Sequence, residues 1–222
     1  MPFKAALFDM DGVIVNTEPL HKKAYFEMFD NFQLKVPQSL YATFTGKSTW
    51  SVCQKLVALF ELTCSPQELV DKKRECFGYL FDHDTEFNLL PGVEALLENY
   101  ASHGVKMVLA SSASMLTINR VFERFHLAPY FMDKLSGADL TASKPHPEIF
   151  ELAAKRAGEP KANCIVIEDS TNGIQAAHAA KIRCVAYKSP HSKDQDYELA
   201  QKVISDFAEI HMETAFYNTL GS

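Results

Sequence analysis

The chain has 222 residues, of which 47% are hydrophobic and 23% are charged, a balance typical of a folded globular protein and not of a disordered or fibrous one. Its net charge is -6, from 28 acidic and 22 basic residues, and it has no basic block, which argues against nucleic acid as a partner. No apolar run is long enough to cross a bilayer, and residues 1–4 lack the layout of a signal peptide. We therefore expect a cytoplasmic protein with no membrane partner.

The five cysteines are scattered and contain no Cys-x-x-Cys pair. An odd number without such spacing favours reduced thiols over a disulfide framework or a metal site. The cysteines are Cys53, Cys64, Cys76, Cys164 and Cys184.

Short apolar runs predict the strands of a parallel sheet. The first run, at residues 5–8, is rich in apolar residues without polar alternation, which suits a central strand covered on both faces. Later runs repeat this form and predict strands at residues 106–111, 164–169, 183–187 and, more weakly, 202–204.

Helical patterns lie between these runs. They predict helices at residues 93–103, 147–157 and 173–180. The first precedes the strand at 106–111, and each of the other two lies between two predicted strands. This alternation of strands and helices indicates right-handed βαβ units.

The stretch from about residue 18 to residue 84 breaks the alternation, because it contains helical patterns without convincing strands. Helices are expected there at residues 20–29, 50–60 and 66–81. The prediction is thus an α/β fold: a doubly wound, Rossmann-like parallel-sheet core with an inserted α-helical cap domain. The core comprises residues 1–16 and 87–222, and the cap comprises residues 17–86.

Reactive side chains gather where the predicted strands end. Asp9 and Asp11 follow the first strand, Ser111 ends the next one, and Glu168 and Asp169 end a later one. Ligands of open parallel sheets bind outside the carboxyl ends of the strands, so these residues are expected to share one site. Lys144 lies in a loop that leads to a helix and is expected to join them.

These residue types suit phosphoryl transfer. A carboxylate such as Asp9 can attack phosphorus and form a mixed anhydride, which divides one difficult displacement into two easier ones. The repulsion between the two anions calls for a cation, and Mg²⁺ prefers the oxygen ligands that Asp9, Asp169 and the backbone carbonyl of Asp11 can supply. Asp11 is suited to protonate the leaving alkoxide and then to deprotonate water.

Two further side chains are expected to contact the phosphoryl group. Lys144 can stabilise its charge, and the Ser111 hydroxyl can donate a hydrogen bond to one of its oxygens. Glu168 is expected to orient a metal-bound water.

Four segments carry a resemblance to the haloacid dehalogenase-like hydrolase superfamily. They are Phe8-Asp9-Met10-Asp11-Gly12-Val13, Leu109-Ala110-Ser111-Ser112, Ser143-Lys144-Pro145-His146-Pro147 and Ile167-Glu168-Asp169-Ser170. Within that superfamily the chain is similar to the β-phosphoglucomutase and sugar-phosphatase branch, which has a helical cap after the first motif. The resemblance implies Mg²⁺ dependence, an aspartyl-phosphate intermediate, a small phosphorylated substrate, and phosphate binding by Ser111 and Ser112.

Phosphatase and mutase remain alternative activities. Mutases of this branch carry a cap arginine and a Lys-Asn pair for a second phosphate, whereas this chain has Thr49 and Ser114-Met115 at those places. Lys47, or residues 72–74, could substitute as point charges. The differences favour a phosphatase of sugar phosphates over a β-phosphoglucomutase-type enzyme.

Four cap residues are candidate substrate contacts: Glu18, His21, Gly46 and Lys47. The cap is expected to open for substrate and to close over the acyl phosphate, with hinges near residues 15–17 and 86–87. A third reading, a catalytically idle binding protein, is disfavoured because gathering these charges without an ion is costly.

Overall fold

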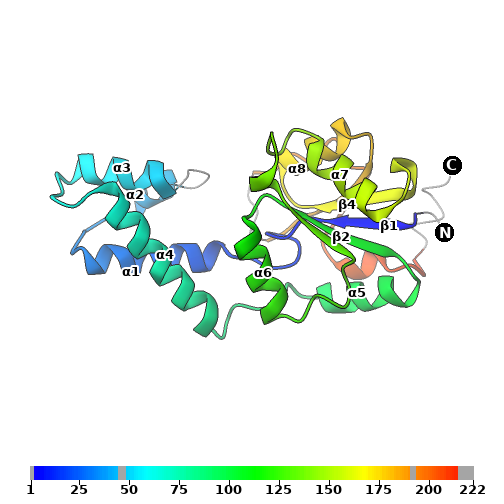
Figure 1. Ribbon diagram of the computed structural model, residues 1–222, viewed down its shortest axis with the longest axis horizontal. Helices are drawn as coiled ribbons and strands as arrows, with labels where there is room; N and C mark the ends of the chain where they lie inside the picture. The colour runs from blue at the N-terminus through cyan, green and yellow to red at the C-terminus, as the bar shows by residue number, and fades with distance from the viewer. Residues whose placement is uncertain (1–2, 45–48, 191–193, 215–222) are drawn as a thin grey trace. The chain divides into compact units, whose positions relative to one another are not determined.

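The computed structural model describes residues 3–44, 49–190 and 194–214, and this part of the chain divides into two compact units (Figure 1). The core unit comprises Met1–Asn16 and Asn88–Ser222, and the helical unit comprises Thr17–Phe87. The sequence analysis placed the first boundary at the same residue and the return to the core one residue earlier, at residue 87. Among the described residues, no helix combines the length and the apolar character that a membrane span requires.

The core unit is built on a six-stranded sheet in the order β3-β2-β1-β4-β5-β6, in which every neighbouring pair is parallel. The doubly wound α/β core expected from the sequence is confirmed. The strands are β1 (Ala5–Phe8), β2 (Lys106–Ser111), β3 (Asp133–Ser136), β4 (Cys164–Glu168), β5 (Arg183–Tyr187) and β6 (Lys202–Ile204).

Helices cover both faces of this sheet, which explains why the central strands are apolar on both sides. The α-helices of the core unit are α5 (Val93–Ser102), α6 (Met115–Arg124), α7 (Glu148–Ala157) and α8 (Thr171–Ala179). Short 3-10 helices are η2 (Gly137–Asp139), η3 (Lys161–Asn163) and η4 (Phe207–Ile210).

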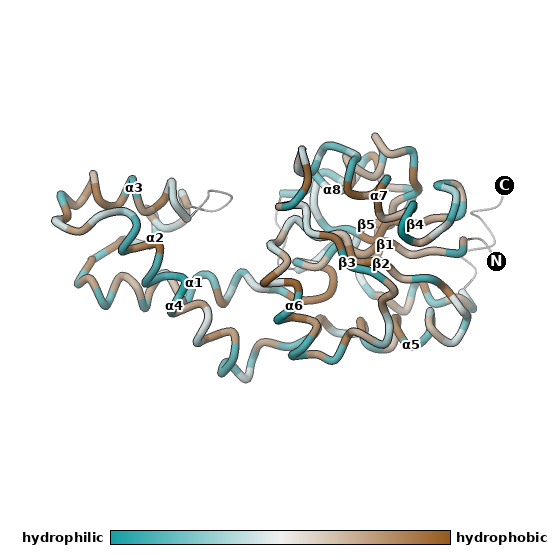
Figure 2. The backbone as a smooth tube through the Cα atoms, in the orientation of Figure 1, coloured by the Kyte–Doolittle hydropathy of each residue, from teal (hydrophilic) through white to brown (hydrophobic). Residues whose placement is uncertain are grey.

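Adjacent residues of β1 show how the two faces are filled. Leu7 packs in a buried cluster with residues of α7 and α8. Phe8 points to the other face, where its ring meets Tyr100 of α5 at 6.1 Å and Phe131 at 5.6 Å between centroids. Figure 2 shows hydrophobic colouring along the central strands. Burial on both faces fixes β1 as the centre of the sheet.

The helical unit contains α1 (Glu18–Asn31), α2 (Gln38–Tyr41), η1 (Ala42–Phe44), α3 (Thr49–Leu59) and α4 (Pro66–His83). Its own aromatic and aliphatic cluster includes Tyr25, Phe29, Tyr41, Val52, Leu56 and Leu69. Helix α4 starts at a capping box, because the Ser65 hydroxyl accepts from the backbone N–H of Glu68 while the Glu68 carboxylate accepts from the backbone N–H of Ser65.

Besides the short 3-10 helices, one strand and one α-helix of the described core unit are absent from the sequence prediction. Strand β3 is an edge strand of four residues whose first half is polar, so it lacks the apolar run that marked the others. Helix α6 presents Ile118, Val121 and Phe122 to the core and is capped by the Ser114 hydroxyl, which accepts from Thr117 N–H. Its helical periodicity was readable in the sequence.

Candidate active site

Strand pairing brings Asp9 beside Glu168 and Asp169. Strand β1 lies between β2 and β4, with Phe8 opposite both Leu109 and Ile167. The backbone N–H of Asp9 continues this pairing by donating to the carbonyl of Ile167 at 3.0 Å. The residues that follow β1 and β4 therefore emerge side by side at the carboxyl edge of the sheet.

Lys144 bridges the ends of the two strands. Its ammonium donates to Asp9 Oδ1 at 2.5 Å and to Glu168 Oε1 at 2.8 Å, although Lys144 is 135 residues from Asp9 in sequence. Only 5% of the Lys144 side chain is exposed, and the side chains of its two partners are similarly buried. The structure thus places three of the expected site residues in direct contact.

Asp11 and Gly12 belong to a tight turn that follows Asp9. The backbone N–H groups of Ile14 and Val15 both donate to the carbonyl of Met10, at 2.8 and 3.0 Å. Gly12 has a φ of 93°, a backbone conformation that residues with a side chain rarely adopt. A Cβ at this position would lie 2.1 Å from Asp169 Oδ2. Glycine is therefore required for the Asp169 carboxylate to lie against this turn, while Asp11 is exposed to solvent.

Ser111 ends β2 and is oriented by its own loop. Its hydroxyl oxygen accepts from the backbone N–H of Ala113 at 3.1 Å, which leaves the hydroxyl proton available for another acceptor. The Ser136 hydroxyl, from the end of β3, donates to the carbonyl of Ala113 at 2.9 Å. Sequence reasoning missed this anchoring role of Ser136, because it missed β3. Ser112, the other expected phosphate contact, is exposed beside this loop.

The site carries more negative than positive charge. Asp9, Glu168 and Asp169 are each less than 10% exposed, and the buried ammonium of Lys144 pairs with the first two. Burial raises the pKa of Asp9, Lys144 opposes this, and the charges of Glu168 and Asp169 raise the pKa further. The pKa of Lys144 is raised by Asp9 and Glu168, against the opposing effect of burial, so the lysine stays charged.

A model of the haloacid dehalogenase-like hydrolase family matches residues 3–181, which include the whole constellation around Asp9. The chain belongs to the haloacid dehalogenase-like hydrolase family. This confirms the resemblance that its four segments carry.

Several known proteins are similar to this chain over most of its length. The fructose-1-phosphate phosphatase YqaB of Escherichia coli is 29% identical over 82% of this chain and 95% of its own length. The crystal structure of a β-phosphoglucomutase from Clostridium difficile has a TM-score of 0.72 and 25% identity, and covers 98% of this chain and 96% of that one. The Arabidopsis thaliana protein Suppressor of quenching 1 is 30% identical over 85% of this chain, which spans only 18% of that longer relative.

The residues of this haloacid dehalogenase-like site fit a magnesium ion. In the described parts of the chain, no group of three or more His, Cys, Asp or Glu side chains is arranged to hold a metal. The expected ligands do not require such a group, because two are the side chains of Asp9 and Asp169 and the third is the carbonyl of Asp11. The excess of buried carboxylates over Lys144 favours a divalent cation with oxygen ligands.

The helical unit buries a second lysine, which the sequence analysis considered only within residues 72–74, as a possible substitute for the cap arginine of a mutase. Lys73 is 4% exposed, and its ammonium donates to His21 Nδ1 at 2.7 Å. It also lies over the rings of Tyr25 and Phe77, at 5.2 and 4.9 Å from their centroids. Lys73 shares the buried face of α4 with Leu69, Val70 and Cys76, so helical periodicity was the signal that could have identified it.

Burial and the charge of Lys73 lower the pKa of His21 to about 4, so His21 is neutral at physiological pH. Of the other cap candidates, Glu18 is exposed at the start of α1, whereas Gly46 and Lys47 lie outside the described residues.

We expect Lys73 to make the stability of the helical unit depend on pH. Burial lowers its pKa from 10.5 to about 8, so between these values the unfolded chain binds more protons than the folded chain, and stability rises with pH. The wild type should therefore gain stability relative to Lys73→Met as the pH rises. Between pH 7 and pH 10.5 its free energy of unfolding should increase by roughly 2–3 kcal/mol more than that of the variant.

Urea unfolding followed by the fluorescence of Trp50, the single tryptophan, reports on this unit. Lys72→Met removes a more exposed lysine from the same helix and should show no such slope. A flat difference for Lys73→Met would contradict the prediction.

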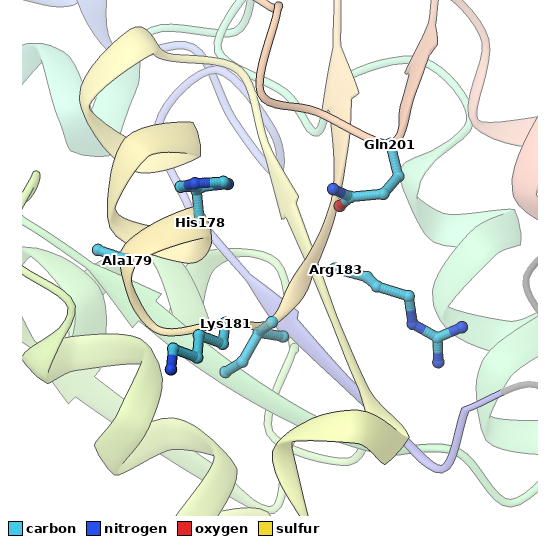
Figure 3. A pocket seen from close by; sticks show the side chains of 6 residues that line it. His178, Ala179, Lys181, Arg183 and Gln201 are labelled. Atoms are coloured by element: carbon cyan, nitrogen blue, oxygen red, sulfur yellow. The ribbon is translucent and has the colours of Figure 1, made fainter.

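A pocket lies at the opposite edge of the sheet, where β5 and β6 begin (Figure 3). It has a volume of about 590 Å³ and is lined by His178, Ala179, Lys181, Ile182, Arg183 and Gln201. Figure 3 shows that the side chains of Lys181 and Arg183 extend in different directions. These two cations therefore do not converge on one point of this pocket.

Proposed function

We propose that this family member is a Mg²⁺-dependent phosphatase that hydrolyses small phosphorylated metabolites, most directly sugar phosphates, through an aspartyl-phosphate on Asp9. The observation that carries the proposal is the buried contact of Lys144 with both Asp9 and Glu168 at the end of β1. The similarity to a fructose-1-phosphate phosphatase supports the substrate class.

In the first step an Asp9 carboxylate oxygen attacks phosphorus, and the bond from phosphorus to the ester oxygen breaks. Lys144 stabilises the negative charge on the phosphoryl oxygens, and the Ser111 hydroxyl donates to one of them. Asp11 gives its proton to the leaving alkoxide. Magnesium, when bound by Asp9, Asp169 and the carbonyl of Asp11, would neutralise the charge that opposes the attack.

In the second step water attacks the phosphorus of the aspartyl-phosphate. Asp11, now a carboxylate, accepts the proton of this water, and the acyl phosphate bond breaks to release phosphate and free Asp9. The exposed position of Asp11 beside the buried Asp9 suits a group that must exchange protons with leaving group and water.

Replacing Asp11 by asparagine should lower kcat by about 10²–10⁴-fold, because the leaving group and the attacking water both lose their proton-transfer partner. Substrates with acidic leaving groups need little protonation, so p-nitrophenyl phosphate should still phosphorylate Asp9 in this variant. A burst of p-nitrophenol followed by slow turnover, measured by stopped-flow absorbance, is the expected result. Equal impairment of the burst and the steady state would contradict this role.

A mutase is the second candidate, favoured by the similarity to a β-phosphoglucomutase structure. A mutase holds a second phosphate, and the position of its Lys-Asn pair is occupied here by Ser114-Met115. The Ser114 hydroxyl is engaged in capping α6, where it accepts from Thr117 N–H and bonds the Thr117 hydroxyl at 3.1 Å. This arrangement supports the phosphatase.

A phosphate-release screen with Mg²⁺ over sugar phosphates, nucleotides and phosphoglycolate tests the proposal. The expected result is release from sugar phosphates that requires Asp9 and is lost on chelation. Conversion of β-glucose 1-phosphate to glucose 6-phosphate with a bisphosphate activator, without free phosphate, would overturn it in favour of the mutase. Binding without turnover of any phosphate ester would indicate an idle binding protein.

A further inference from the structure

The Glu168 carboxylate is the centre of a closed turn at the end of β4. Its Oε2 accepts three hydrogen bonds, from the backbone N–H groups of Asp169 at 2.7 Å and Ser170 at 2.8 Å and from the Ser170 hydroxyl at 2.9 Å. Its Oε1 accepts from Lys144 at 2.8 Å. With 1% exposure and four donors, Glu168 is held in one place.

Ser170 connects this carboxylate to helix α8. While its hydroxyl donates to Glu168, the hydroxyl oxygen accepts from the backbone N–H of Gly173 at 3.1 Å and so caps the helix. A single hydroxyl therefore fixes the carboxylate relative to the first turn of α8.

Gly173 leaves the space that the Glu168 carboxylate occupies. A Cβ at residue 173 would lie 1.6 Å from Oε1 and 1.9 Å from Cδ of Glu168. Glycine is otherwise among the least favoured residues inside a helix, so its presence in α8 has a packing reason. A methyl group there must displace the carboxylate, and displacement breaks the bonds to Lys144 and to the turn.

We propose that Ser170 and Gly173 are positioning residues for phosphoryl transfer: they fix Glu168, and Glu168 in turn fixes the Lys144 ammonium beside Asp9. This inference rests on the proposed function, because it is the role of Lys144 on the phosphoryl group that gives its position a catalytic consequence. Small displacements of a group that stabilises transition-state charge reduce the rate strongly, since the stabilisation depends on preorganised geometry.

A double-mutant cycle between Gly173→Ala and Glu168→Ala tests the inference, with p-nitrophenyl phosphate and Mg²⁺ as the assay. Gly173→Ala should lower kcat on the order of 10²-fold. In the Glu168→Ala background the same substitution should change kcat by less than about twofold, because no carboxylate remains to be displaced. If Gly173→Ala only disturbed helix α8, it would lower kcat by the same factor with and without Glu168.

Thermal unfolding gives a readout independent of activity. Alanine favours helices over glycine, so Gly173→Ala should raise Tm when Glu168 is also replaced by alanine. In the presence of Glu168 the clash should make the same substitution lower Tm. This reversal of sign is specific to a steric conflict with the carboxylate.

Matched variants separate the hydroxyl of Ser170 from general effects on α8. Ser170→Ala should lower kcat, and Ser170→Thr, which keeps the hydroxyl, should restore most of it. Asn172→Ala changes an exposed residue of the same turn and should leave both kcat and Tm near the wild-type values.

The outcomes distinguish the two proposals. If the wild type does not hydrolyse the aryl phosphate, the proposed function fails. If the wild type is active and Gly173→Ala keeps wild-type kcat, or loses the same factor with and without Glu168, the positioning role is overturned. Should Gly173→Ala not fold, the contrast between Ser170→Ala and Ser170→Thr decides in its place.

Discussion

Asparagine in place of Asp9 should reduce kcat for phosphate release by about 10⁴-fold or more. The amide keeps the size of the carboxylate and can still contact Lys144, but it is a poor nucleophile and cannot form a stable acyl phosphate. Steady-state release of phosphate from the best substrate of the screen measures the effect.

Asp30→Asn is a matched control, because it neutralises an exposed aspartate on α1. It should retain wild-type kcat and KM. A value of kcat for Asp9→Asn within tenfold of the wild type, with folding intact, would eliminate Asp9 as the nucleophile.

Replacing Lys144 by methionine should affect stability as well as activity. The lysine is the buried cation shared by Asp9 and Glu168, so its removal leaves their carboxylates without a partner. Breaking a buried ion pair from one side typically costs about 3–5 kcal/mol, and the free energy of unfolding without Mg²⁺ should fall by this amount. The loss of charge stabilisation should lower kcat by about 10³-fold.

Urea unfolding with and without Mg²⁺ measures the first effect. Mg²⁺ should recover part of the lost stability, because a cation that binds the folded site offsets its negative charge. Lys188→Met, which changes an exposed lysine of the core unit, should be close to neutral. Equal stabilities for Lys144→Met and Lys188→Met would contradict the account of the buried site.

The sequence predicted the fold best where burial produces a continuous run of apolar residues along the chain. Central strands such as β1 and β4 are covered on both faces, so their residues are apolar up to Glu168 at the end of β4, and the runs could be found without coordinates. The reactive residues could be found for a related reason, since the carboxyl ends of parallel strands meet at one edge. The short edge strand β3 carries no such pattern and was missed.

Contacts between distant segments could not be predicted. Nothing in the sequence indicates that Lys144 contacts Glu168 as well as Asp9, or that Gly173 must leave room for that carboxylate. The pairing of Lys73 with His21, 52 residues apart, is equally invisible until α1 and α4 are folded together. Such contacts depend on three-dimensional packing, which the sequence pattern does not reveal.

Identifying the residue that becomes phosphorylated during turnover tests whether Asp9 is the nucleophile. A single turnover of substrate by the Asp11→Asn variant, quenched in acid and digested, can be analysed by mass spectrometry. If Asp9 is the nucleophile, the peptide that contains Asp9 should carry one added phosphoryl group, and no phosphopeptide should form when Asp9 is also replaced by asparagine. Complete release of phosphate with no phosphorylated peptide at any time point, or a phosphoryl group on a different residue, would contradict this role of Asp9.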